Sequence, residues 1–181
     1  MNRPPLEILA PVGSPEMLEA AVRCGADAVY MGASAFHARR NSYCFSDDEL
    51  RRAVEYCHAR GMAVHLTLNT LIREEEMTAA VALAQTACAA GVDALIVQDM
   101  AVLEMDLPPV ELHASTQAHI DSPQKAEFLH RAGFSRVVVA RELSAAQIRQ
   151  VAENTGAEIE AFVHGALCVS YSGQCYLSQA M

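Results

Sequence analysis

The sequence has few basic residues. Lysine and arginine number 13 against 22 aspartates and glutamates, which gives a formal net charge of −9 at pH 7. A protein that binds nucleic acid through charge needs clustered lysine and arginine to neutralise phosphates, so this composition argues against that class. A contact with RNA would therefore have to be local, or would have to come from a part of the protein beyond these 181 residues.

Long apolar runs are also missing. No run approaches the roughly 20 residues that a bilayer-spanning helix needs, and residues 1–5 lack the apolar core of a secretory signal. We therefore expect a cytoplasmic protein without membrane contact. The apolar content of 52% is enough for one good core, and no low-complexity linker interrupts it, so we expect a single domain over residues 1–181.

Cysteine occurs six times, but a disulfide framework is not its expected use. The chain is large, rich in core residues and free of a secretory signal, so reduced thiols are expected. Cys44 lies in a polar loop without a partner at metal-site spacing and stays unassigned. Three cysteines fall on apolar faces of expected helices, where a free thiol packs as a small hydrophobe: Cys24, Cys57 and Cys88.

Seven short apolar runs alternate with amphipathic helical patterns. Most of the runs are apolar throughout, which is typical of parallel strands covered on both faces. The expected strands are 7–10, 28–31, 63–68, 94–97, 111–114, 136–140 and 158–163, and the expected helices are 15–24, 46–60, 73–90, 122–132 and 144–154. Serines mark three helix starts, at Ser14, Ser46 and Ser122. Glycines mark the helix ends in expected left-handed conformations, at Gly25, Gly61, Gly91, Gly133 and Gly156.

This repeated order predicts an α/β fold. We expect a parallel (β/α)8-like TIM-type barrel that has about seven strands and is therefore one unit short. An open parallel sheet with a similar number of strands is the alternative. A sheet with a missing unit would leave an edge through which two copies of the chain could pair.

Polar side chains follow the carboxyl ends of the expected strands, where the loops of a parallel βα architecture converge. We expect catalytic roles in proton transfer or substrate polarisation for His113, Glu142 and His164. We expect substrate binding by Asn69, Gln98, Asp99, Ser115, Thr116, Gln117 and Arg141. Arg141 is expected to hold a small anionic co-substrate with its two-pronged guanidinium group.

Structural alternatives exist for several of these residues. His113 stands inside an apolar strand, so a core histidine is an open alternative. Arg141 and Glu142 could form a structural ion pair, and a lone Asn or Asp at a strand end is often a loop cap. Among the other histidines, His65 is expected to pack in its strand, whereas His58, His119 and His130 are expected to be solvated.

Two cysteines, Cys168 and Cys175, follow the last apolar run and His164. Their spacing is too wide for the Cys-x-x-Cys pair of a structural zinc site. They could be two of the four thiolates that an iron–sulfur cluster normally requires. A nucleophilic cysteine paired with His164 is the rival interpretation.

Taken in order, these motifs resemble peptidase family U32, the collagenase-like proteins. The segments that carry the resemblance are 9–14, 25–32, 69–70, 93–99, 113–117, 140–144, 162–168 and 171–175. Within the family, residues 97–99 and 107–113 are most similar to the branch of bacterial proteins that hydroxylate a cytidine of 23S ribosomal RNA.

The resemblance implies a longer protein that carries this barrel at its amino end. Several family members use a four-cysteine [4Fe-4S] cluster for oxygen-independent hydroxylation of RNA bases or of ubiquinone precursors, with prephenate implicated as co-substrate for RNA. Cys168 and Cys175 match the first two cluster cysteines, and the other two would follow Met181. RNA hydroxylation is thus the expected activity.

Two other functions stay open. The family name implies a peptidase, but the chain has no Ser-His-Asp order, no His-Glu-x-x-His zinc motif and no obvious catalytic carboxylate pair. A non-catalytic assembly fragment is the second alternative, because the expected barrel is incomplete.

Overall fold

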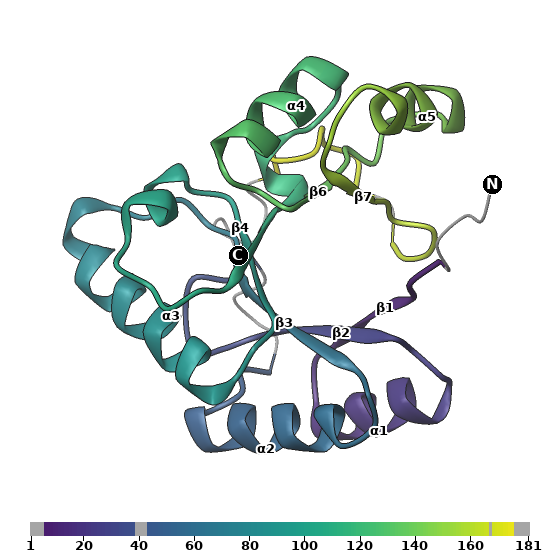
Figure 1. Cartoon of the computed structure of the whole chain (residues 1–181). Helices are drawn as coiled ribbons and strands as arrows, with labels where there is room; N and C mark the ends of the chain where they lie inside the picture. The colour runs from purple at the N-terminus through teal and green to yellow at the C-terminus, as the bar shows by residue number, and fades with distance from the viewer. Residues whose placement is uncertain (1–5, 39–42, 167, 176–181) are drawn as a thin grey trace.

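The computed structural model describes residues 6–38, 43–166 and 168–175. These residues form one sheet of seven parallel strands in the order β1-β2-β3-β4-β5-β6-β7. The sheet curls into an incomplete barrel, and Figure 1 shows its open side between β7 and β1. The strands are β1 Leu9–Val12, β2 Ala28–Gly32, β3 Ala63–Leu68, β4 Ala94–Val97, β5 Glu111–Ala114, β6 Arg136–Val138 and β7 Glu158–Glu160. The expected fold class is therefore confirmed.

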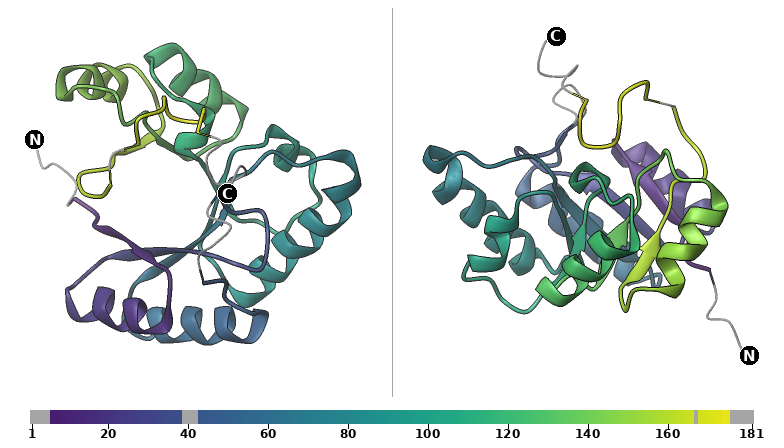
Figure 2. Two further views of the ribbon diagram at one scale, coloured as in Figure 1. Left: turned by 180° about the vertical axis from the view of Figure 1, so that it is seen from behind. Right: turned by 90° about the horizontal axis from the view of Figure 1, so that it is seen from above.

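The helices cover the outer face of this sheet (Figures 1 and 2). The α-helices are α1 Pro15–Arg23, α2 Asp47–His58, α3 Met77–Ala90, α4 Pro123–Ala132 and α5 Ala145–Glu153, and the 3-10 turns are η1 Glu74–Glu76, η2 Met100–Glu104 and η3 Thr116–Ala118. Only η2 connects β4 to β5, so this crossover lacks a full helix. In the described residues no helix has the length and apolar character to cross a bilayer.

The helix starts follow the sequence signals. The side chain of Ser14 accepts a hydrogen bond from the backbone N–H of Met17, and Ser122 does the same for Lys125. Ser46 and Glu49 form a reciprocal capping box. Each such cap contributes about 1 kcal/mol, so the helix starts are defined locally.

The expected left-handed glycines are confirmed at four helix ends: Gly25, Gly61, Gly91 and Gly133. The prediction for Gly156 was wrong, because its φ is not positive. Gly156 instead packs so closely on the ring of His130 that a Cβ atom would collide with it, and its N–H donates to Glu127. A close approach to α4, rather than a turn, therefore explains this glycine.

The apolar core lies between the sheet and its helices. Leu66 and Leu95 from the strands belong to the same buried cluster as Leu50 of α2 and Ala84 of α3. Side chains alternate along a strand, so the residues between these core positions face the barrel interior. Buried polar residues occupy those positions: His65, Thr67, His113 and Ser115. The barrel interior thus carries several buried polar side chains, whereas the layer between the sheet and the helices is apolar.

Candidate functional site

The loops that follow β6 and β7 meet at the carboxyl end of the barrel. The carboxylate of Glu142 accepts hydrogen bonds from both the backbone N–H and the hydroxyl of Ser172, each at 2.7 Å. The same Ser172 hydroxyl accepts from the backbone N–H of Arg141 at 3.1 Å. Ser172 is fully buried by these contacts. It therefore fixes residues 168–175, here called the thiol loop, against the Arg141–Glu142 pair; Figure 2 shows this yellow segment passing over one end of the strands.

The two thiols of this loop lie together. The Cys168 thiol lies close enough to Cys175 and to the guanidinium group of Arg141 to interact with both. The backbone N–H of Ser170, followed by these two side chains, holds the pKa of the Cys168 thiol below its usual range. A lowered pKa favours the thiolate, which is the form that binds metal or acts as a nucleophile.

The thiol loop also packs on the loop after β5. Gly173 has a φ of 79° and lies directly on the carbonyl oxygen of Gln117, where any side chain would collide with the backbone. That carbonyl also accepts a hydrogen bond from Nε2 of Gln98 at 3.3 Å. The structure therefore brings Gln98, Gln117, Arg141, Glu142 and the two thiols to one rim; their individual roles stay predictions.

His119 belongs to the same rim, although its place in the sequence predicted a solvated side chain. It is only 29% exposed, and its Nδ1 lies 3.8 Å from a carboxylate oxygen of Glu142. Its Nε2 lies 3.4 Å from Asp121, and its ring stands edge-on to Tyr171 of the thiol loop. The position of His119 just beyond the polar end of β5 was the sequence signal that could have identified it.

His113 lies elsewhere, which corrects its expected place on the rim. It is 1% exposed inside the barrel, its Nε2 lies 3.2 Å from Glu111 at the start of β5, and its ring stands edge-on to His65. It pairs in register with Arg136, the first residue of β6. Burial lowers the pKa of His113, and it lowers the pKa of His65 to about 4. This placement agrees with the alternative of a buried interior histidine, and a catalytic role for His113 stays a prediction.

Arg136 closes the amino end of the barrel with an ion-pair network. Its guanidinium group lies 2.6 Å from Glu7, just before β1, and 2.7 Å from Glu158 in β7. Although burial acts in the opposite direction, the hydrogen bonds to these two carboxylates raise the pKa of Arg136. The network therefore links the two strands that border the open side.

Two other predicted residues have structural partners. The amide oxygen of Asn69 accepts from the backbone N–H of Ala38, and the carboxylate of Asp99 caps Ala101 and accepts from Ile72. These contacts match the loop-cap alternative for strand-end residues. His164 lies exposed in the segment after β7, and its catalytic role stays a prediction.

An interior cavity of about 50 Å³ lies between the rim and the Arg136 network. Asn69, Ser115 and Thr116 line it, together with Glu160 and Phe162 from the end of β7. Burial raises the pKa of Glu160 to about 7. The Ser115 hydroxyl accepts from the N–H of Gln117, so this wall is tied to the rim.

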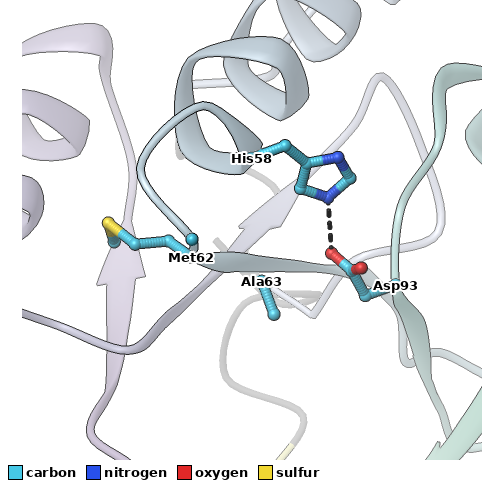
Figure 3. A pocket seen from close by; sticks show the side chains of 5 residues that line it. His58, Met62, Ala63 and Asp93 are labelled. Atoms are coloured by element: carbon cyan, nitrogen blue, oxygen red, sulfur yellow. Dashed lines mark hydrogen bonds and ion pairs between the residues drawn. The ribbon is translucent and has the colours of Figure 1, made fainter.

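A larger and shallower hollow, of about 310 Å³, lies at the starts of β3 and β4 (Figure 3). There Nε2 of His58 lies 2.9 Å from a carboxylate oxygen of Asp93, and that oxygen also accepts from the backbone N–H of Val64. This hollow is at the opposite end of the strands from the thiols. We therefore assign the candidate site to the rim and the interior cavity.

The metal-binding capacity of the site is partial. In residues 6–38, 43–166 and 168–175, no group of three or more His, Cys, Asp or Glu side chains is placed to hold a metal ion. Cys168 and Cys175 do supply two adjacent thiols beside the guanidinium group of Arg141. Two such thiols fit half of the four-thiolate set of an iron–sulfur cluster.

Comparison with known proteins decides the family. The pattern of peptidase family U32 matches residues 13–181. The chain belongs to peptidase family U32. A solved structure of the U32 peptidase Mk0906 has the same fold, with a TM-score of 0.70 over 89% of this chain and 70% of that chain at 18% identity.

Curated relatives cover nearly the whole chain. The 23S rRNA 5-hydroxycytidine C2501 synthase of Escherichia coli is 47% identical over 97% of this chain, and tRNA hydroxylation protein P1 of Bacillus subtilis is 38% identical over 97%. A collagenase of Porphyromonas gingivalis is 38% identical over 98%. The chain spans only 27%, 42% and 46% of the length of these three relatives.

Proposed function

We propose that this U32 chain is the amino-terminal barrel of an enzyme that hydroxylates a base in RNA. The relatives named for rRNA and tRNA hydroxylation support the reaction class. Because the chain spans less than half of their length, the activity is proposed for the full-length protein, with a cytoplasmic RNA as substrate. The basic surface that RNA binding requires would come mainly from the rest of that protein, since the net charge here is −9.

The observation that carries the proposal is the hydrogen bonding of Ser172 to Glu142. It keeps two thiols, a guanidinium group and a carboxylate within one short stretch of the rim. Such a cluster of groups from separate loops at the carboxyl end of a parallel barrel is typical of an active site.

Cys168 and Cys175 would hold a [4Fe-4S] cluster with two further cysteines from beyond Met181. When bound, the cluster would supply electron transfer for oxygen-independent chemistry. Arg141 lies beside Cys168, where its charge stabilises the thiolate and where it could bind a carboxylate of an anionic co-substrate such as prephenate. Both carboxylate oxygens of Glu142 accept hydrogen bonds from Ser172. We therefore propose that Glu142 positions the thiol loop as well as taking part in proton transfer.

The test is a pair of substitutions in the full-length protein, Cys168→Ser and Cys175→Ser. After anaerobic reconstitution, we expect each variant to lose most of its bound iron, its visible absorption and its hydroxylated nucleoside in digested RNA. Cys24→Ser is the matched control, because Cys24 is exposed at the end of α1 and does not pack on an apolar face as the sequence predicted. A Cys168→Ser variant with unchanged iron and unchanged product would refute the assignment.

Peptide hydrolysis is the second candidate, because the family name and the collagenase relative point to it. Ser172 is a poor candidate for the nucleophile, since its side chain is fully buried. Cys168 would have to serve. Cleavage of a collagen peptide that survives removal of iron and disappears in Cys168→Ser would favour the peptidase over the hydroxylase.

A further inference from the structure

The interior cavity has an unused polar group. Oε2 of Glu160 is buried and has no hydrogen-bond partner among the described residues. The nearest cation is Nη1 of Arg136 at 3.8 Å, which is beyond hydrogen-bonding distance. Arg136 is already engaged at 2.6 Å with Glu7 and at 2.7 Å with Glu158. Since buried polar atoms are almost always satisfied, the free oxygen of Glu160 indicates a partner that enters the cavity.

The lining of the cavity limits what that partner is. Its walls carry an amide, hydroxyl groups and one carboxyl group, contributed among others by Asn69, Ser115, Thr116 and Glu160, and no lysine or arginine of the described residues lines it. A phosphate or carboxylate would therefore find no cationic partner among the lining residues. A neutral group that can both donate and accept hydrogen bonds fits the lining.

The size of the cavity sets a second limit. Its volume of about 50 Å³ exceeds the roughly 30 Å³ that one water occupies in the liquid, but it is too small for a nucleoside. A flat ring could therefore insert only one edge, with its remaining atoms and its sugar outside.

The mouth offers a surface for such a ring. Phe162 lines the cavity two positions after Glu160 and is 48% exposed. A half-exposed aromatic side chain is a sequence-tolerant stacking partner for a nucleobase. Enzymes that modify a base in RNA or DNA bring it out of its stack and hold it between apolar walls and hydrogen-bonding groups.

We propose that this cavity receives the hydrogen-bonding edge of a pyrimidine base of RNA, with Glu160 as its polar partner and Phe162 as its stacking surface. The inference rests on the proposed function and adds the residues that select the base. A protonated carboxyl group presents one donor beside one acceptor, which matches the N3 and amino group of cytosine and equally the N3–H and O4 of uracil. Burial favours this protonated form, because it raises the pKa of Glu160 to about 7 despite the opposing effect of Arg136.

A double-mutant cycle tests the contact directly. The full-length protein is titrated with a single-stranded RNA of about ten nucleotides, within the usual site size of single-strand binding, that carries one central cytidine, and with the same RNA carrying an abasic site there. We expect removal of the base to weaken wild-type binding about tenfold, which is the scale of one good base contact. Glu160→Ala should weaken binding of the cytidine RNA by a similar factor and leave binding of the abasic RNA nearly unchanged.

Two further variants strengthen the design. Glu160→Gln keeps one donor and one acceptor and should recover most of the affinity that Glu160→Ala loses. Glu55→Ala removes an exposed carboxylate from α2 and is the control for charge. If Glu160→Ala does not fold, the same cycle with Phe162→Ala decides the question, because that side chain is half exposed.

The outcomes are separable. If base removal weakens binding by the same factor in wild type, Glu160→Ala and Phe162→Ala, the cavity holds only water and the inference is wrong. If the wild-type protein still hydroxylates RNA in that case, the proposed function is retained and only the inference about the cavity is wrong. If the wild-type protein neither binds nor modifies RNA, the proposed function and the inference about the cavity are both wrong.

Discussion

Replacing Glu160 with glutamine should change how the stability of this barrel depends on pH. The pKa of Glu160 is about 7 in the folded chain against 4.5 for the unfolded group. A carboxyl group with a raised pKa binds more protons in the folded state, so its contribution favours folding at low pH and is lost as pH rises from 4.5 through 7. Glutamine carries no ionisable proton and removes this dependence.

The magnitude follows from the two pKa values. When the folded and unfolded pKa values differ by one, the free energy of unfolding changes by about 1.4 kcal/mol. Integrated between about pH 5 and pH 7, the linkage amounts to about 2 kcal/mol for this carboxyl group. The free energy of unfolding of Glu160→Gln, minus that of wild type, should therefore increase by about 2 kcal/mol over this range. The variant becomes more stable relative to wild type, because the wild-type chain must bury an ionised carboxylate at the higher pH.

The assay is urea unfolding of the 181-residue chain at a series of pH values. Glu55→Gln is the matched control, because Glu55 is exposed on α2, and its difference from wild type should stay constant. A difference between Glu160→Gln and wild type that is the same at pH 5 and pH 7 would refute the reasoning and show that Glu160 is ionised and satisfied in the fold.

Three more predictions concern the interior and the rim. His65→Gln should change the pH dependence in the opposite direction, because burial lowers the pKa of His65 to about 4 from its ordinary 6.5. The contribution of His65 is present above pH 6.5 and falls by about 2 kcal/mol between pH 7 and pH 5. In urea unfolding, the free energy of unfolding of His65→Gln minus that of wild type should therefore increase by about 2 kcal/mol as pH falls from 7 to 5, and a constant difference would contradict this. Gly173→Ala should displace the thiol loop, because a Cβ would strike the Gln117 carbonyl; a changed alkylation rate of Cys168 checks this, with Gly13→Ala as control, and an unchanged rate would contradict it. Ser172→Ala should cost about 1–3 kcal/mol, since it removes the buried hydroxyl that donates to Glu142 and accepts from the backbone N–H of Arg141; urea unfolding measures it, and a cost below about 0.5 kcal/mol would contradict the role given to this serine.

The order and type of the elements could be predicted from the sequence. Each strand is a short apolar run, and the serine caps and most helix-end glycines act through neighbours only a few residues away. Such local signals need no knowledge of the fold. Gly156 shows where local signals end, because its close approach to His130 depends on how α4 packs beside the α5–β7 turn.

The rim could be predicted only in part. Parallel strands bring their carboxyl ends to one side, so Arg141, Glu142 and the thiols could be expected there from strand order. His119 was missed because a histidine in a loop carries no local sign of its partners. His113 was misplaced because the depth of a residue inside a barrel depends on the stagger between strands, which the run of apolar residues does not encode.

The two carboxylates of β7 show which properties the sequence determines and which the tertiary structure determines. Glu158 and Glu160 stand two residues apart in the sequence and face the same side of the strand, so the pattern treats them alike. In the folded chain, Glu158 reaches Arg136 at the exposed amino end, whereas Glu160 lies one step deeper with an unused oxygen beside a cavity. The sequence alone determined the parallel β/α architecture, because the signals for its helices, strands and turns are local. The burial of individual side chains, the stagger of the strands and the meeting of the rim loops were decided by the tertiary structure, because they depend on residues far apart in the chain.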